Sequence, residues 1–232
     1  MVTRNGLILL MLLLASTAQA TVFNVVNDFS LASNPNGVWT YGSESTLGGT
    51  FSPYLSSSTH SSGLEVWSNG GLPLDFYNPT GSPIFLAGTV NIPTGAAGFH
   101  PGPSGEYSLF RFTTPFAGTY NLSVSFTGFD YVGGTTTDVH VLQGSNSLFS
   151  GYVDGYLSTE SYIGSLSLAA NEIVDFAVGP GGNGYLYDTT GIAATLSTVA
   201  DGGGASVPEP ASLALLGIGL AGLGAARRRK TS

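Results

Sequence analysis

A two-residue alternation of apolar and polar side chains recurs between Thr21 and Asp201 and restricts this stretch to sheet structure. It is clearest at residues 120–127 (YNLSVSFT), where every second side chain is large and apolar. Because successive side chains of a strand point to opposite faces of a sheet, this segment predicts a strand with one buried face. Further segments with strand character are 22–26, 38–41, 64–67, 84–86, 89–92, 107–113, 138–143, 147–149, 162–168, 172–178 and 191–198.

The glycine and cysteine content agrees with an all-β fold that is held together by its core. The chain has 34 Gly and no Cys, so turns are frequent and no disulfide can form. About ten short strands at intervals of about 8–15 residues are typical of a sandwich. We therefore predict that residues 21–200 form an all-β, antiparallel β-sandwich of jelly-roll-like type.

The first 20 residues have the three parts of a secretory signal peptide. Arg4 marks the charged start, residues 7–15 form a short apolar core, and Ala18 and Ala20 supply the small-x-small pattern of a cleavage site. We predict recognition by the secretion machinery and cleavage by signal peptidase after Ala20.

Residues 207–232 follow a Gly-rich linker at 201–206 and combine three features. A Pro-Glu-Pro tripeptide stays extended, because proline fixes φ and lacks a backbone donor. An uncharged apolar run at 211–226 predicts a transmembrane helix, and a basic cluster at 227–230 keeps the end of the chain on the cytoplasmic side. The residues that define this tail are Pro208, Glu209, Pro210, Arg227, Arg228 and Arg229.

This order of features resembles the PEP-CTERM sorting signal of Gram-negative bacteria. The resemblance implies recognition by an exosortase-type enzyme, removal of the tail and an association with exopolysaccharide production. The predicted path is export across the inner membrane, transient anchoring there by the C-terminal helix, and delivery to the cell envelope, the surface or the medium. A plain C-terminal membrane anchor is the alternative interpretation.

The charges of the exported part are strongly one-sided. Between Thr21 and Asp201 the only Lys or Arg is Arg111, whereas nearly all the Asp and Glu lie in this region. A nucleic-acid-binding domain needs a basic surface, so we expect no nucleic acid partner. Anionic lipid headgroups are disfavoured for the same reason. Divalent cations and neutral sugars remain as partners, and the alternative is that the acidity only keeps a surface protein soluble.

The candidate metal-ligating residues are Asp138, His140 and Asp188. Asp138 and His140 stand two residues apart on a predicted strand, so their side chains share a face. Acidic, Gly-rich loops also leave a structural calcium ion open as a cofactor, because calcium takes six to eight oxygen ligands. The alternatives are a polar strand face for Asp138 and His140 and turn formation for Asp188.

The candidate glycan-binding residues are Trp39, Trp67, Tyr185 and Tyr187, which lie in predicted loops or strands and at strand ends. Aromatic rings suit ligands that are apolar on one side and hydroxylated on the other, as sugars are. Tyr185 and Tyr187 follow a Gly-rich loop and are predicted to be exposed. For the two Trp residues, a place in the core is the alternative.

Residues 100–198 resemble the lectin-like or carbohydrate-binding-like sandwich domains of exported bacterial proteins. The segments that carry this resemblance are HPG, RFTTPFAGTYNLSVSFTG, TTTDVHVL and VDFAVGPGGNGYLYDTTG. They match in their general pattern of strands and turns, and no ligand residues transfer from them.

Motifs of catalysis are missing, since the sequence contains no GxSxG, SxxK, HExxH or Walker loop. We therefore expect a protein that is not an enzyme and has no catalytic residues. The predicted function is that of an exosortase-sorted surface or extracellular matrix protein whose sandwich binds exopolysaccharide glycans. The alternatives are a purely structural envelope or biofilm protein and a secreted glycan-active hydrolase, whose paired carboxylates need not be close in sequence.

Overall fold

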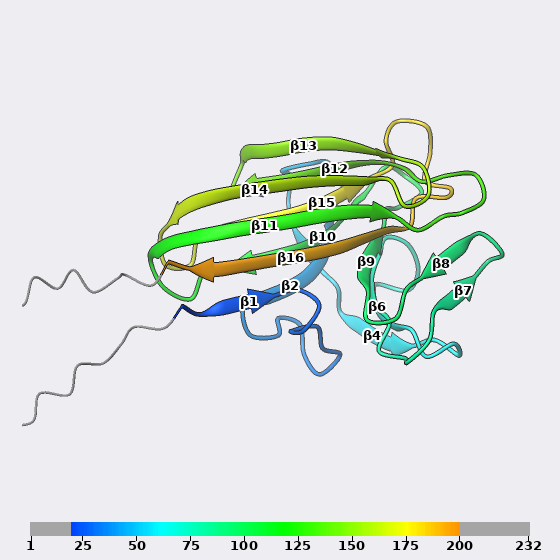
Figure 1. Ribbon diagram of the computed structural model, residues 1–232, viewed down its shortest axis with the longest axis horizontal. Helices are drawn as coiled ribbons and strands as arrows, with labels where there is room; N and C mark the ends of the chain where they lie inside the picture. The colour runs from blue at the N-terminus through cyan, green and yellow to red at the C-terminus, as the bar shows by residue number, and fades with distance from the viewer. Residues whose placement is uncertain (1–19, 200–232) are drawn as a thin grey trace, which may run out of the picture. The chain divides into compact units, whose positions relative to one another are not determined.

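Two antiparallel sheets stacked face to face make up most of the structure (Figure 1). The computed structural model describes residues 20–199, of which Thr21–Val199 form one unit. The eight-stranded sheet has the order β14 (Thr159–Leu168), β11 (Gly118–Gly128), β16 (Thr190–Thr198), β9 (Ala97–His100), β6 (Leu74–Tyr77), β5 (Glu65–Ser68) and β4 (Ser56–Thr59), and β1 (Val22–Asn24) also pairs with β16. The six-stranded sheet has the order β13 (Asn146–Asp154), β12 (Thr136–Gln143), β15 (Ile173–Gly179), β10 (Tyr107–Thr113), β2 (Trp39–Glu44) and β3 (Ser52–Pro53). A separate hairpin consists of β7 (Ile84–Leu86) and β8 (Val90–Ile92).

The main core lies between the two sheets and follows from the alternation seen in the sequence. On β11, the side chains of Tyr120, Leu122, Val124 and Phe126 are all buried, as the alternation predicts. Nine further members of this cluster come from β2, β10, β12 and β15 of the six-stranded sheet. Burying one large apolar side chain contributes about 1.5–3 kcal/mol, so we expect this cluster to dominate the stability of the fold.

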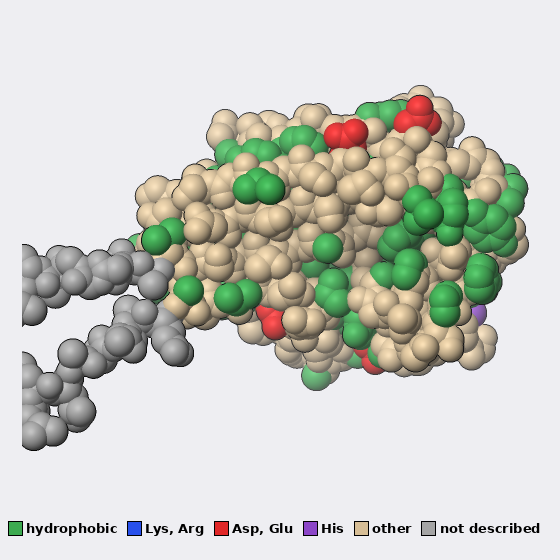
Figure 2. Space-filling model, viewed as in Figure 1, with side chains coloured by type: hydrophobic (Ala, Val, Ile, Leu, Met, Phe, Trp, Pro, Cys, Tyr) green, Lys and Arg blue, Asp and Glu red, His purple; other side chains and the backbone are tan. Residues whose placement is uncertain are grey.

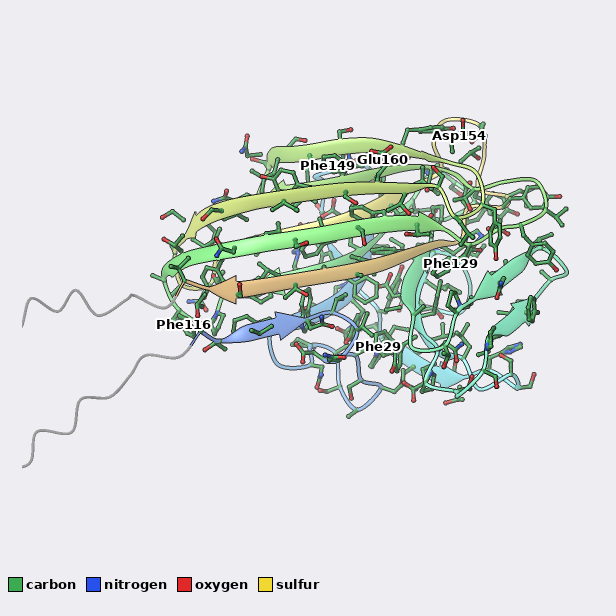
Figure 3. All side chains as sticks on the ribbon, in the orientation of Figure 1. Phe29, Phe116, Phe129, Phe149, Asp154 and Glu160 are labelled. Atoms are coloured by element: carbon green, nitrogen blue, oxygen red, sulfur yellow. The ribbon has the colours of Figure 1, made fainter. Side chains whose placement is uncertain are left out.

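A second apolar cluster lies where the eight-stranded sheet changes direction. One edge of β16 is shared, because residues 190–192 pair with β9 and residues 195–197 pair with β1. From β9 onward the sheet turns away from the long strands and faces the β7–β8 hairpin (Figure 1). Phe129, which follows β11, lies at this junction (Figure 3). The buried members of the second cluster are Leu64, Phe76, Ile84, Val90, Ile92 and Phe129.

The all-β, antiparallel two-sheet sandwich is confirmed, whereas the jelly-roll designation stays a prediction. The position of β6 corrects the sequence analysis, which gives no strand between residues 68 and 83. The alternation of apolar and polar residues in β6 is broken because Asp75 is buried within the strand. Asp75 Oδ1 accepts a hydrogen bond of 2.8 Å from Ser108 Oγ. Strands β3, β4 and β9 are also additional to the predicted ones, and β13 is longer than predicted.

Both predicted targeting segments lie outside the described residues, apart from Ala20, which is the first residue that the structure describes. This holds for Ala18 of the cleavage pattern, for the linker at 201–206 and for the sorting tail at 207–232. Within residues 20–199, no helix is both long and apolar enough to cross a membrane.

Candidate functional site

A pocket of about 410 Å³ opens at the end of the unit where β11 ends and β16 begins. It adjoins the second cluster and is bounded by β6, β9, the β7–β8 hairpin and the loop that precedes β16. Figure 2 shows hydrophobic side chains gathered at this end of the unit. The volume lies in the range of small-molecule sites, which is about 300–1,000 Å³.

The buried lining of the pocket is mainly apolar, with Asp130 and Thr189 as its polar members. Leu64, Phe76, Val90 and Ile92 form the inner wall, and each is at most 8% exposed. These residues come from the turned part of the sheet and from the hairpin, so the pocket is the unfilled part of the second cluster. Further out, the lining continues with Leu72, Leu74, Leu86 and Ala87.

Two titratable side chains, His100 at the end of β9 and Asp130 beyond β11, also line the pocket. Asp130 is buried, and its Oδ2 accepts a hydrogen bond of 2.7 Å from the backbone N–H of Thr189. His100 Nδ1 lies 2.9 Å from the carbonyl oxygen of Pro101, so in the neutral ring Nδ1 donates and Nε2 is the acceptor.

The pocket favours the uncharged forms of both groups. Burial raises the pKa of the Asp130 carboxyl, although hydrogen bonds from Thr189 and Thr89 and the charge of His100 oppose this shift. Burial lowers the pKa of the His100 ring, against the bond to Pro101 and the charge of Asp130. Desolvation always disfavours the charged form of a group, which explains the opposite directions. The pocket therefore adds two hydrogen-bonding groups to a mainly apolar lining.

The loop between β15 and β16 places Tyr185, Leu186 and Tyr187 at the mouth of the pocket. Tyr185 is half-buried, and its ring centroid lies 6.3 Å from that of His100 in an edge-on arrangement. Leu186 and Tyr187 are exposed. The ring of Tyr187 lies against Gly133, which has a φ of +87°, and a Cβ at Gly133 would come within 2.6 Å of that ring. This close approach helps to hold the orientation of Tyr187.

A row of exposed aromatic rings continues from this end of the unit across the hairpin. The ring centroids of Phe85 and Tyr131 are 6.4 Å apart and those of Tyr131 and Tyr156 are 6.1 Å apart, both in edge-to-face arrangements. Asn91 Nδ2 donates a hydrogen bond of 2.9 Å to Tyr156 Oη, and the backbone N–H of Tyr131 donates one of 2.7 Å to the carbonyl of Thr89. These contacts fix the hairpin, and with it one wall of the pocket.

The two Trp residues lie away from this pocket. Trp39 is fully buried in the main core, and its Nε1 donates a hydrogen bond of 3.1 Å to Asp28 Oδ2. Trp67 is 5% exposed, and its Nε1 donates one of 2.8 Å to the carbonyl of Ser30. Neither indole offers a free face to a sugar, so their placement agrees with the core alternative. Of the four candidate glycan-binding residues, the structure brings together Tyr185 and Tyr187.

Asp138 and His140 share a face of β12, and the structure pairs them directly. Asp138 Oδ2 lies 2.9 Å from His140 Nε2 and accepts a hydrogen bond of 2.7 Å from Tyr107 Oη. Its Oδ1 accepts one of 2.8 Å from the backbone N–H of Gly181. Burial alone would raise the pKa of Asp138, but these hydrogen bonds lower it to about 2. The carboxylate is thus already held by donors from three elements.

Asp188 is held separately from that pair. Its Oδ1 accepts hydrogen bonds from Thr136, of 3.3 Å from the backbone N–H and 3.2 Å from Oγ1. Burial raises the pKa of Asp188 to about 7 against the effect of these bonds, and the charges of Asp130 and Asp138 add to the rise. Within residues 20–199, no three His, Cys, Asp or Glu side chains are arranged to hold a metal ion. A metal role for Asp138, His140 and Asp188, and a structural calcium ion, stay predictions.

Sequence reasoning missed most of the pocket lining. Leu64, Phe76 and Ile92 have the character of ordinary core residues, and only the fold reveals that one side of each faces a cavity. The signal that could have pointed to this site is the sequence Tyr185-Leu186-Tyr187, three large side chains that follow a Gly-rich loop.

Comparison with known protein families identifies the C-terminal segment. Residues 206–230 match the PEP-CTERM protein-sorting motif. This match covers the Pro-Glu-Pro tripeptide, the apolar run and the basic cluster described above. The motif implies export, processing by an exosortase and sorting to the cell surface. No curated protein matches the sequence at a significant level.

Several solved structures are similar to the chain at a low level. A family 51 carbohydrate-binding module from Clostridium perfringens GH95, solved with methyl-galactose, is 14% identical and has a TM-score of 0.34, over 62% of this chain and 93% of that one. A family 35 carbohydrate-binding module from Clostridium thermocellum is 14% identical, with a TM-score of 0.32 over 49% and 85% of the two chains. The vertex protein P5 of PRD1 is 12% identical, with a TM-score of 0.30 over 54% and 86%. Likeness at this level says nothing about a ligand of the present chain.

Proposed function

We propose that this is an exported, exosortase-sorted surface protein that binds a saccharide in the pocket at the end of its sandwich and catalyses no reaction. The observation that carries the proposal is the composition of the pocket mouth. Tyr185 and Tyr187 line the same pocket as His100 and Asp130. Ligand sites are typically concave and apolar, with a few polar groups that fix the orientation of the ligand, and this pocket has that composition.

The chemistry of the mouth suits a sugar. The face of a pyranose ring is apolar and its edge carries hydroxyls, so it matches a site that combines aromatic rings with hydrogen-bonding groups. Tyr185 and Tyr187 supply rings and hydroxyls, and His100 Nε2 supplies an acceptor. No Lys or Arg is among the described residues that line the pocket, so the pocket offers no cationic partner to an anionic ligand.

A non-enzymatic role agrees with the carboxylates of the site. Most glycoside hydrolases use two carboxyl groups that flank the scissile bond. Among the described residues that line the pocket, Asp130 is the one carboxyl, and its Oδ2 already accepts a hydrogen bond from Thr189. This arrangement favours binding over hydrolysis.

A glycan array probed with the full chain tests the proposal. We expect the wild-type chain to bind a subset of neutral saccharides, and Tyr185→Ala and Tyr187→Ala each to weaken that binding at least tenfold. Tyr162→Ala is the matched control, because Tyr162 is a half-buried tyrosine on β14 outside the pocket. Binding that Tyr162→Ala reduces as much as the two pocket variants would place the site elsewhere. A chain that binds no saccharide would favour the purely structural alternative.

The sorting part of the proposal has its own measurement. The intact mass of the protein recovered from the surface of the producing cells should correspond to cleavage after Ala20 and to loss of the tail near Pro208. A recovered protein that still carries residues 207–232 would contradict processing and would favour a plain membrane anchor.

A further inference from the structure

We propose that the pocket takes the apolar substituent of an O-acylated neutral saccharide, with the acyl group inside and the sugar at the mouth. This inference rests on the proposed function and names the class of ligand. The observation that supports it is that the inner part and the mouth of the pocket are lined by different kinds of side chain. The buried part of the lining is mainly apolar and includes Leu64 and Ile92, with Asp130 and Thr189 as its polar members, whereas the phenol hydroxyls of Tyr185 and Tyr187 are at the mouth.

An unsubstituted sugar would fit the inner wall poorly. Hydroxyl groups placed against Leu64, Phe76 and Ile92 would lose their hydrogen bonds to water without gaining others. Each buried, unpaired hydroxyl lowers the affinity about 5- to 150-fold, and a pyranose carries several hydroxyls. An acyl or alkyl chain has no such cost, and each methylene that it buries raises the affinity about fourfold, which corresponds to about 0.8 kcal/mol.

The polar groups near the mouth fit the other half of such a ligand. His100 Nε2 is free to accept a hydrogen bond from a sugar hydroxyl, because Nδ1 is turned to the carbonyl of Pro101. The half-buried Thr89 and Tyr185 add two hydroxyls beside it. Those groups can bind the ester carbonyl or the ring hydroxyls next to it, so an ester-linked chain could enter the pocket while the sugar stays hydrated.

A membrane lipid is disfavoured as the source of the apolar chain. Among residues 20–199 the only Lys or Arg is Arg111, and it is already paired with Asp175 at 2.7 Å and Glu44 at 3.3 Å. A unit with so little positive charge and many acids is repelled by anionic bilayers. A single pocket of about 410 Å³ also suits one short substituent better than a pair of long lipid chains.

The first test is a series of glycosides with one sugar and increasing alkyl chains. Methyl, butyl and hexyl β-D-glucosides are titrated calorimetrically into the full chain, which is kept soluble by an amphipathic polymer. We expect the affinity of the wild type to rise about fourfold per buried methylene. Val90→Phe, which fills the inner end of the pocket, should remove this dependence on chain length. Leu86→Trp fills the pocket from the hairpin and serves as the second variant if Val90→Phe does not fold.

The outcomes distinguish binding of the alkyl chain in the pocket from binding elsewhere. An equal affinity for methyl and hexyl glucoside in the wild type would overturn the inference. An unchanged chain-length dependence in folded Val90→Phe and Leu86→Trp would also overturn it, because the alkyl chain would then bind elsewhere, for example to the polymer.

The second test uses exopolysaccharide from the producing cells, before and after mild alkaline removal of its ester groups. We expect binding to the native polymer and at least a tenfold loss after de-acylation. Equal binding to both forms would overturn the acyl inference and leave saccharide binding in place. Binding to neither form, together with an empty glycan array, would contradict the proposed function itself. Binding to glycolipid vesicles in preference to the native polymer would overturn the choice of an acylated polysaccharide.

Discussion

The two apolar clusters of the unit differ in how completely they are covered. The main core has twenty-five buried residues and the second cluster has six, and this difference follows from their surroundings. Two long sheets close the main core from both sides, so its side chains interdigitate. The second cluster has the turned part of one sheet on one side and a short hairpin on the other, and a pocket remains between them.

This difference shows how a sandwich can be stable and still have a binding site. Protein interiors are close-packed, and a cavity inside a core reduces stability. Here the cavity lies at the end of the unit, where the main core has already been completed. The second cluster can therefore stay incompletely filled at a smaller cost to the whole fold.

The largest effect that distinguishes the clusters is expected from matched Leu→Ala substitutions. Leu122→Ala in the main core should reduce the free energy of unfolding by about 3–5 kcal/mol, because it creates a cavity in close-packed surroundings. Leu64→Ala should cost about 1–3 kcal/mol, because one side of Leu64 already faces the pocket. Urea unfolding of both variants checks this order. Equal losses would mean that the pocket is filled in solution.

The second effect is a pH dependence that comes from the pocket end. Asp188 lies beside Thr189 of the pocket wall, and burial raises its pKa to about 7. Below about pH 4 the carboxyl is protonated in both folded and unfolded chains, so stability with respect to this group is at its highest there and does not change with pH. Between about pH 4 and about 7 the unfolded chain releases the proton and the folded chain retains it, so stability falls as the pH rises. The slope is about 1.4 kcal/mol per pH unit at most.

Asp188→Asn should remove this part of the pH dependence, on the order of 3 kcal/mol between about pH 4.5 and about 7. Thermal unfolding of both proteins across this range measures it. The buried Asp75 and Asp130, whose pKa values burial also raises, should leave a slope of the same sign, whereas His100, whose pKa burial lowers, adds one of the opposite sign. Parallel curves for the wild type and the variant would show that Asp188 ionises normally in the folded chain.

The third effect uses added volume instead of removed volume. Val124→Phe should reduce the free energy of unfolding by about 1–3 kcal/mol, because the main core has no room for a phenyl ring in place of the valine side chain. Val90→Phe should cost less than about 1 kcal/mol, because Val90 lines the pocket and the ring can enter it. Chemical unfolding of the two variants compares them directly. A larger loss for Val90→Phe would contradict the volume of the pocket.

The smallest effect concerns the attachment of the hairpin. Tyr156→Phe removes the hydrogen bond from Asn91 to Tyr156 Oη and should cost about 0.5–1 kcal/mol. Because this bond holds the β7–β8 hairpin, backbone amides in β7 and β8 should exchange hydrogen about two- to fivefold faster, while those of β10 and β15 stay unchanged. Native-state hydrogen exchange measures both groups. Uniform acceleration would mean that the hairpin opens only with the whole fold.

The difference between the main core and the second cluster also explains which strands the sequence could predict. The main core is built from long strands such as β11, whose alternation of Tyr120, Leu122, Val124 and Phe126 is plain in the sequence and confirmed in the structure. The turned part of the sheet is built from short strands, and in β6 the buried Asp75 interrupts the pattern. Short strands carry too few alternations to be distinguished from loops.

The candidate site was predictable only in part. The Gly-rich loop predicted that Tyr185 and Tyr187 are exposed, which holds for Tyr187, whereas Tyr185 is half-buried beside His100. That the two tyrosines meet His100 and Asp130 depends on pairings between distant segments, which a local pattern does not contain. The burial of Trp39 likewise depends on the second sheet, and for that reason the sequence left two interpretations open.

The pairing of β1 with β16 has a mechanical consequence. Thr21 and Thr198 are hydrogen-bonded, so both ends of the described chain leave the unit together, about 30 Å along β16 from the pocket. A force applied between the C-terminal end of the unit and a polymer held in the pocket would pull on opposite ends of the sandwich. Such tension acts along β16, which is paired with β11 from Thr198 to Thr190. The hydrogen bonds between β16 and β11 would then be loaded in shear. They would have to break together, instead of one after another from one end.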